Sequence, residues 1–209
     1  MTDIITQNSG MLRLKETIGK VANSTSSVLI CGETGTGKEL VASSLHNASY
    51  RKAKPFVAVN CAALPESILE GLLLAPGRGL YRGGKPKRPF SGGGWGTLYL
   101  DEINSMPLNL QAKLLRVLQE KQVMPLGSTQ PIAVDVRIVS SSNCPPDELV
   151  RNGELRPDLL YRLNTVTLAI PPLNQRPDDI PLLSEYFLYK YSRVLGKPVP
   201  RWPRRRFFF

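Results

Sequence analysis

The chain has 209 residues, a formal net charge of +10 and 42% hydrophobic residues. This composition suits one sizeable folded domain, and no apolar run is long enough to span a membrane. Cys31, Cys61 and Cys144 are widely spaced and match neither a disulfide framework nor a metal-ligand pattern. The first ten residues lack the basic and apolar regions of an export signal. We therefore expect a cytoplasmic protein whose cysteines act as small apolar residues.

The positive charge is concentrated in two short stretches. Residues 78–88 contain five Lys or Arg residues, and residues 201–206 contain four. Without these nine, 18 of the 27 basic residues remain against 17 acidic ones, so the rest of the chain is nearly neutral. A distributed basic face for nucleic acid is therefore not expected.

Helical and strand patterns alternate along the chain. In chain order we expect helix 11–22, strand 26–31, helix 38–48, strand 55–60, helix 65–74, strand 97–102, helix 109–123, strands 134–143 and 164–170, and helix 178–195. This alternation predicts an α/β fold in which helices cover both faces of a parallel sheet.

Residues 28–42, VLICGETGTGKELVA, join a buried strand to a helix through a glycine-rich turn. Glycines let successive backbone N–H groups curl towards an anion, and the helix start adds its dipole. A lysine at this offset reaches the β- and γ-phosphates of a nucleotide. A glycine-rich turn without a ligand is the alternative. The residues predicted to bind the nucleotide are Gly32, Glu33, Thr34, Gly35, Thr36, Gly37, Lys38 and Glu39, the last standing where a magnesium-binding Ser or Thr is usual.

Two acids, Asp101 and Glu102, end the apolar strand in TLYLDE. A carboxylate at the tip of the strand beside the phosphate loop can hold Mg²⁺, directly or through water. The neighbouring carboxylate can orient and deprotonate an attacking water molecule. An acid pair at a strand end is otherwise commonly a solvated cap. Together with the phosphate loop, this pair predicts a nucleotide hydrolase.

Six segments together resemble the AAA+ domain of bacterial enhancer-binding proteins, the sigma-54-dependent transcriptional activators. The resemblance covers about residues 3–73 and 97–198, and it implies a P-loop NTPase fold with a five-stranded parallel sheet between helices. It also implies ATP and Mg²⁺ as cofactors, a homo-oligomeric and hexameric ring, and sigma-54 RNA polymerase holoenzyme as partner. In that family Glu commonly follows the loop lysine. The segments are GETGTGKELVA, PFVAVNCAALPES, GTLYLDEI, LQAKLLRVLQE, VDVRIV and PPLNQRPDDIPLL.

The resemblance implies roles for further residues. Asn60 matches the residue that holds the catalytic Glu102 back until a partner is sensed, with a capping Asn after the strand as the alternative. Asn143 matches the sensor I position, from which an amide reaches the γ-phosphate or the water. Arg156 and Arg162 match arginine fingers, which act on the nucleotide of a neighbouring subunit.

By this resemblance, residues 1–180 form the nucleotide-binding core, and residues 181–209 form the start of a helical lid that is mostly missing. Two stretches depart from the family, residues 74–96 and the tail 201–209, RWPRRRFFF. Positions 79–84 stand where the family carries its sigma-contacting GAFTGA loop, and Arg82 replaces the contact threonine. We expect no DNA-binding domain in this chain.

A shift of reading frame accounts for the first departure. One allowed set of codons for residues 78–84, read one base later, encodes Gly-Ala-Tyr-Thr-Gly-Ala, a version of the missing motif. We hypothesise that two compensating single-base shifts bracket this stretch and that a third shift produced the tail. A flexible linker or a nucleic-acid-binding loop is the alternative. Three functions follow: an ATP-hydrolysing activator, a non-functional remnant that at most binds nucleotide, and, last, a basic nucleic-acid-binding protein.

Overall fold

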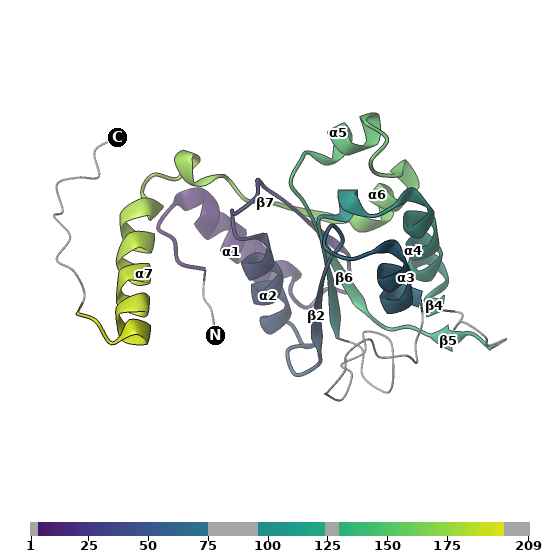
Figure 1. Ribbon diagram of the computed structural model, residues 1–209, viewed down its shortest axis with the longest axis horizontal. Helices are drawn as coiled ribbons and strands as arrows, with labels where there is room; N and C mark the ends of the chain where they lie inside the picture. Colours follow the sequence, from purple (N-terminus) through teal and green to yellow (C-terminus); the bar gives the residue numbers. More distant parts are fainter. Residues whose placement is uncertain (1–3, 75–95, 124–129, 199–209) are drawn as a thin grey trace.

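The central feature of the protein is a five-stranded parallel sheet. The computed structural model describes residues 4–74, 96–123 and 130–198, and Figure 1 shows the sheet between two groups of helices. The α/β fold and the five-stranded sheet expected from the sequence are confirmed. In sheet order the strands are β2 (Phe56–Asn60), β3 (Thr97–Asp101), β6 (Arg137–Ser142), β1 (Val28–Cys31) and β7 (Val166–Ala169).

The strands bury side chains on both faces of the sheet, because successive residues of a strand point to opposite sides. In β1, Leu29 belongs to one buried cluster, whereas Val28 and Ile30 belong to the other. Each fully buried side chain of this size stabilises the fold by about 1.5–3 kcal/mol. Largely apolar strands such as β1 and the middle of β3 therefore suit a sheet covered on both faces.

Each face is covered by its own helices. The cluster containing Val28 and Ile30 includes buried residues of α1 (Ser9–Val21) and α2 (Lys38–Asn47). On the other face, the cluster containing Leu29 packs against four helices. These are α3 (Glu66–Leu74), α4 (Leu108–Glu120), α5 (Pro146–Arg151) and α6 (Pro157–Leu163).

The strand order corrects one expectation. The acid-bearing strand β3 does not lie directly beside the phosphate-loop strand β1, because β6 pairs in parallel with both of them. Leu29 of β1 pairs with Ser140 of β6, and Ser140 pairs in turn with Leu100 of β3. The carboxyl end of β6 is therefore the nearest strand end to both halves of the expected site.

The helix expected over 109–123 is also shorter than its pattern suggests. It ends at Glu120, because Lys121 adopts a left-handed conformation with φ of 50°. The next two residues form β4 (Gln122–Val123), which pairs antiparallel with β5 (Ile132–Ala133). Pairing with a segment ten residues further along the chain thus overrides the local helical pattern.

The C-terminal helix α7 (Asp179–Leu195) follows a short 3₁₀ turn, η2 (Leu173–Gln175), and stands apart from the sheet in Figure 1. Its apolar residues are largely exposed, including Phe187, Tyr189, Tyr191, Val194 and Leu195. Among the described residues, no helix is long and apolar enough to cross a membrane. The contact-loop positions 79–84, almost all of the anomalous segment 74–96, and the tail 201–209 lie outside the described residues.

Candidate active site

The phosphate loop, residues 32–38, is tightly curled. Gly35 and Gly37 have φ values of 84° and 99°, in the left-handed region that favours glycine. The hydroxyl of Thr36 donates a hydrogen bond of 2.8 Å to the carbonyl oxygen of Glu33, which closes the turn. Gly37 then caps α2, and its carbonyl accepts from Val41 N at 3.1 Å. The glycine spacing of the sequence thus produces the expected strand–loop–helix cradle.

Lys38, the first residue of α2, is folded back onto this loop and is 7% exposed. Its Nζ donates to the carbonyl oxygens of Gly32 at 2.8 Å and Glu33 at 3.1 Å. A phosphate is a stronger partner for an ammonium group than a neutral carbonyl is. Glu39 follows on the exposed first turn, where its carboxylate meets the positive end of the helix dipole.

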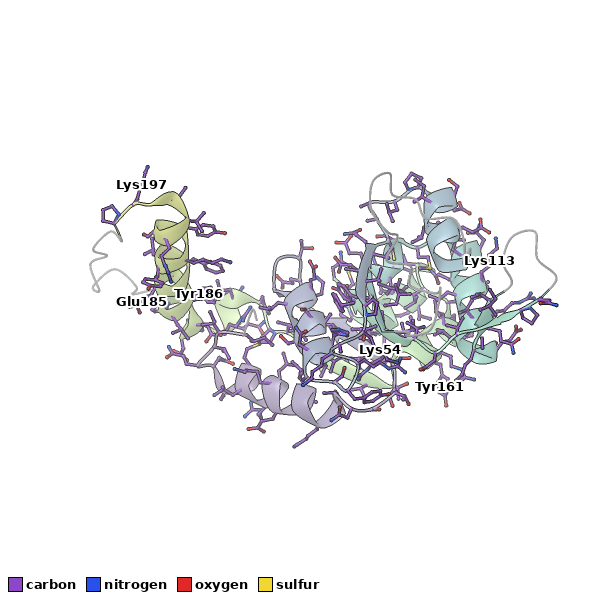
Figure 2. The ribbon with its side chains drawn as sticks, turned by 90° about the horizontal axis from the view of Figure 1, so that it is seen from below. Lys54, Lys113, Tyr161, Glu185, Tyr186 and Lys197 are labelled. Carbon is purple, nitrogen blue, oxygen red and sulfur yellow. The ribbon has the colours of Figure 1, made fainter. Side chains whose placement is uncertain are left out.

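A cleft of about 430 Å³ opens beside the loop. Besides the loop and the first turn of α2, it is lined by three segments that are distant in the sequence: the residues leading into α1, the η2 turn with its flanking residues, and α7. Tyr186 of α7, labelled in Figure 2, is one of these side chains. Such an apolar wall next to a phosphate cradle suits a flat heteroaromatic ring. The lining side chains outside the loop include Ile4, Ile5, Leu173, Arg176, Leu183, Tyr186 and Phe187.

Asp101, at the end of β3, has one oxygen occupied and one largely open. Its Oδ1 accepts hydrogen bonds from Tyr99 Oη at 2.8 Å and from Ser141 Oγ. Burial, reinforced by the adjacent Asp101 carboxylate, raises the pKa of Tyr99, so the phenol remains a donor. On the other side, Asn60 Nδ2 stands 3.5 Å from Asp101 Oδ2. The carboxylate is therefore oriented by two hydroxyl groups that the sequence analysis did not single out.

Both hydroxyl groups have a signal in the sequence that could have found them. Tyr99 precedes Asp101 by two residues, so the two side chains lie on the same face of β3. Ser141 belongs to a run of three serines that ends the buried strand β6, where polar residues need a partner. The strand order that brings Ser141 beside Asp101 is, however, a tertiary feature.

Glu102 has an unusual backbone conformation. Its φ and ψ are 54° and 57°, a left-handed conformation that few residues with a side chain adopt. Its N–H donates to Ser141 Oγ at 3.1 Å, and the 3₁₀ turn η1 (Ile103–Ser105) begins directly after it. A strained residue of this kind is common at functional sites, where surrounding contacts hold it. Ser141 thus links the two acids.

Asn60 caps a turn and also faces an acid. Its Oδ1 accepts from the N–H groups of Ala62 at 2.9 Å and Ala63 at 3.0 Å, as in a capping Asn. Its amide nitrogen is directed to Asp101, not to the Glu102 carboxylate that the resemblance implies. The restraining role of Asn60 towards Glu102 therefore stays a prediction.

Asn143 directly follows β6, at the strand end that lies between the phosphate loop and the acids. Its Oδ1 is buried and has no hydrogen-bond partner within the described ranges. A buried acceptor without a partner costs about 1–3 kcal/mol. An acceptor of this kind at this edge is suited to a water molecule or to a ligand group.

Arg162 lies on α6 and Arg156 directly precedes it; Figure 1 places this helix beside α4, on the sheet face opposite α2. Arg156 precedes the helix, and its Nε and Nη2 bind the Asp158 carboxylate at 3.0 and 2.8 Å. This pairing raises the pKa of Arg156. Arg162 is exposed in the last turn. Neither described arginine lines the cleft of its own phosphate loop.

Residues 4–169 match the model of the sigma-54 interaction domain family. The chain belongs to this family. Three similar relatives are regulators from Escherichia coli K12: the transcriptional regulatory protein GlrR, 50% identical over 200 residues; the regulatory protein AtoC, 47% over 191; and the putative uric acid sigma-54-dependent regulator UacR, 45% over 193. These alignments cover 95%, 90% and 91% of this chain but 45%, 41% and 33% of the relatives.

Solved structures agree with the family assignment. The chain is similar to NtrX from Brucella abortus in complex with ATP, with a TM-score of 0.86 and 33% identity over 99% of this chain and 47% of NtrX. A P-loop NTPase domain of an Escherichia coli sigma-54 activator, 17% identical with a TM-score of 0.53, supports the fold alone. The chain thus has the AAA+ P-loop NTPase fold and spans between a third and a half of the length of these longer relatives.

Proposed function

We propose that the chain is the ATP-binding and ATP-hydrolysing AAA+ module of a sigma-54-dependent transcriptional activator, whose hydrolysis remodels the closed complex of sigma-54 RNA polymerase. One observation carries the proposal: the curled phosphate loop, Asp101 and Asn143 stand at the carboxyl ends of three neighbouring strands, β1, β3 and β6. Ligands of open α/β sheets bind at this edge. We propose a cytoplasmic location, because the relatives are transcriptional regulators.

The groups of this edge divide the chemistry between them. Lys38 exchanges its two carbonyl partners for phosphate oxygens, and the N–H groups of the loop and of α2 surround the remaining oxygens. Glu102 accepts a proton from the attacking water. Asn143 orients this water, which can donate to its unpartnered Oδ1, or donates from its amide Nδ2 to the γ-phosphate.

The donor set at Asp101 fits Mg²⁺. Two hydroxyl donors occupy Oδ1, whereas Oδ2 has the long contact of 3.5 Å with Asn60 Nδ2 and is the hard oxygen that a metal ion can take. Mg²⁺ keeps several waters and takes one or two carboxylates together with substrate phosphates, so a single aspartate suffices. When bound, the ion neutralises charge on the β- and γ-phosphates. Asp101 would hold it, directly or through water.

Arg156 and Arg162 are proposed to act in trans in a homo-oligomeric ring, by family resemblance a hexamer. The support from the structure is their placement: both are outside the cleft of their own chain, and Arg162 is exposed. A guanidinium that reaches a neighbour's γ-phosphate stabilises the charge of the transition state. By the same resemblance we propose that the core extends to residue 180 and that α7 is the first helix of the lid.

An ATPase assay with two variants tests the proposal. Lys38→Ala is expected to abolish nucleotide binding, whereas Glu102→Gln is expected to bind ATP and lose hydrolysis by at least about 100-fold. Hydrolysis per chain is expected to rise steeply with protein concentration, because fingers require a neighbour. Wild-type hydrolysis that persists in both variants would overturn the assignment of the site.

The second candidate is a remnant that binds nucleotide without activating transcription. The observation that favours it is the sequence at 79–84, Gly-Leu-Tyr-Arg-Gly-Gly, where Arg82 stands in place of the contact threonine. ATP binding without turnover, or turnover without opening of a sigma-54 promoter complex, would support it. Resequencing the gene across codons 70–100 tests the origin of the segment, because an unshifted reading would exclude the frameshift hypothesis.

A further inference from the structure

A buried ion pair links the phosphate loop to the start of α7. Arg176 is 7% exposed, and its Nη2 donates to the carbonyl oxygen of Thr36 in the phosphate loop at 3.2 Å. Its Nη1 lies 3.6 Å from Oδ2 of Asp179, a carboxylate that is 0% exposed. Arg176 also lines the cleft beside the loop. The arginine therefore touches the loop with one nitrogen and the buried acid with another.

Asp179 also accepts hydrogen bonds from the segment that leads into α1. Its Oδ2 accepts from Thr6 Oγ1 at 2.7 Å, and its Oδ1 accepts from the N–H groups of Gln7 at 2.8 Å and Asn8 at 3.2 Å. Asn8 in turn caps α1, because its Oδ1 accepts from the first N–H groups of the helix. The Asp179 carboxylate thus holds residues 6–8, which lie more than 170 positions earlier in the sequence.

These contacts form a continuous series of hydrogen bonds and one ion pair from the segment ahead of α1 to the phosphate loop. The order is residues 6–8, Asp179, Arg176, and the carbonyl oxygen of Thr36. Thr36 is also the residue whose hydroxyl closes the loop onto Glu33. A movement of the segment ahead of α1 would therefore reach the turn that presents its N–H groups to phosphate.

We propose that Arg176 and Asp179 are positioning residues that hold the phosphate loop in its binding shape only while residues 6–8 are seated on Asp179. The segment ahead of α1 then regulates nucleotide affinity through this ion pair. The physical reason is that a buried charge cannot be left unpaired: if residues 6–8 leave, Asp179 must find new donors or water. Arg176 then moves together with the Asp179 carboxylate, and its hydrogen bond to the carbonyl oxygen of Thr36 is lost. The regulatory consequence rests on the proposed nucleotide-binding function.

Hydrogen–deuterium exchange of the nucleotide-free chain tests the coupling without relying on that function. Three variants are compared: Thr6→Val, which removes one donor to Asp179; Asp179→Asn, which removes the charge; and Arg176→Gln, which removes the contact to Thr36. All three are expected to raise exchange of the amides of residues 33–37 by about fivefold or more, through local opening. Thr6→Val is the decisive variant because Thr6 has no contact with the loop among its hydrogen bonds.

The control is Asp135→Asn, which removes the charged partner of another buried arginine, Arg51, at a carboxylate that is itself exposed. Arg51, 4% exposed, binds the Asp135 carboxylate at 2.5 Å, at the opposite end of the sheet from the phosphate loop. Because the Asp135 side chain is 69% exposed, this change is expected to alter the melting temperature little and to leave exchange at residues 33–37 unchanged. Faster loop exchange in the control, or loop exchange unchanged in Thr6→Val and Asp179→Asn, would overturn the proposal.

Nucleotide affinity gives a second, separate readout. A fluorescent ATP analogue is expected to bind Arg176→Gln about tenfold more weakly than the wild type, the size expected for a lost hydrogen bond to a charged group. A wild-type chain that does not bind the analogue would contradict the proposed function, while the exchange result would still decide the coupling. A wild-type affinity in all three variants would contradict the regulatory role.

Discussion

The phosphate loop and helix α6 both carry cations expected to meet a triphosphate, but they hold them in opposite ways. Lys38 is 7% exposed and is bound by two carbonyl oxygens of its own loop. The Arg156 side chain is 41% exposed, and it binds Asp158 in the first turn of the helix that follows it. The comparison teaches that the cation of the phosphate loop is enclosed by its own chain, whereas the side chains of the two proposed finger arginines, Arg156 and Arg162, are exposed to solvent.

The largest effect on ATP hydrolysis is expected from the two exposed arginine side chains, Arg156 and Arg162. Arg156→Ala or Arg162→Ala is expected to lower ATP hydrolysis about 10³-fold or more, while affinity for ATP stays near that of the wild type, because arginine fingers act on the transition state. Steady-state hydrolysis and analogue binding measure the two effects. Arg151→Ala, on the neighbouring helix α5, is the control and is expected to be silent.

Mixing two inactive variants sharpens this result. A ring assembled from Arg162→Ala and Glu102→Gln chains contains some boundaries with an intact finger on one side and an intact glutamate on the other. Hydrolysis is therefore expected to recover on mixing if the finger acts in trans. If the mixture stays as inactive as its components, the arginine serves its own chain, and the comparison between the enclosed lysine and the exposed arginines is wrong.

The next largest effect is expected on nucleotide affinity, when the shape of the phosphate loop is disturbed. Gly32→Ala would place a Cβ 2.9 Å from Thr36 Oγ1 and 3.0 Å from the carbonyl oxygen of Ile170, so the loop or the strand end must shift. We expect nucleotide affinity to fall more than about tenfold, measured by titration with the analogue. Gly19→Ala in α1, where a Cβ meets no atom within 4 Å, is the control. Equal affinity in the two variants would show that the loop shape is adaptable.

A smaller effect is expected from the groups that orient Asp101. Tyr99→Phe removes one of the two hydroxyl donors to Oδ1 and keeps the buried ring, so hydrolysis is expected to fall by about tenfold, equivalent to about 1.4 kcal/mol. Kinetics at saturating ATP and Mg²⁺ measure it. Tyr161→Phe, in which the ring is 84% exposed, is the matched control. A wild-type rate in Tyr99→Phe would show that Ser141 alone orients the carboxylate.

The smallest effect on stability and hydrolysis is expected from breaking the exposed ion pair between Arg156 and Asp158. Asp158→Asn removes the partner of Arg156, and the melting temperature is expected to remain unchanged because ion pairs in water contribute little. Hydrolysis is expected to change by less than about twofold if the arginine leaves Asp158 when it reaches a neighbouring nucleotide. A strong loss of hydrolysis would mean that Asp158 sets the position of the finger.

Local chemistry was sufficient to predict much of this site. The loop from Gly32 to Lys38 could be read directly, because glycine conformations, a strand before and a helix after are properties of a short segment. The pair at the end of β3 was found for the same reason. The family resemblance then supplied Asn143, Arg156 and Arg162, whose residue types alone indicate no particular chemistry.

The partners of these residues depend on the tertiary structure. Insertion of β6 between β1 and β3 brings Ser141 to both acids, and this order arises from pairings between segments about 40 to 110 residues apart. Asn60 faces Asp101 for the same reason, since β2 pairs with β3. Short-range patterns contain no information on which strands become neighbours.

The amino-acid sequence by itself determined the α/β class, the five strands and the phosphate cradle, since these follow from residue spacing and backbone preference over about ten residues. Only the tertiary structure decided the strand order, the end of α4 at Glu120, and the Arg176–Asp179 connection between α1 and the loop. Buried charges and strand edges must find partners wherever folding places them, and these partners are set by the packing of the whole chain.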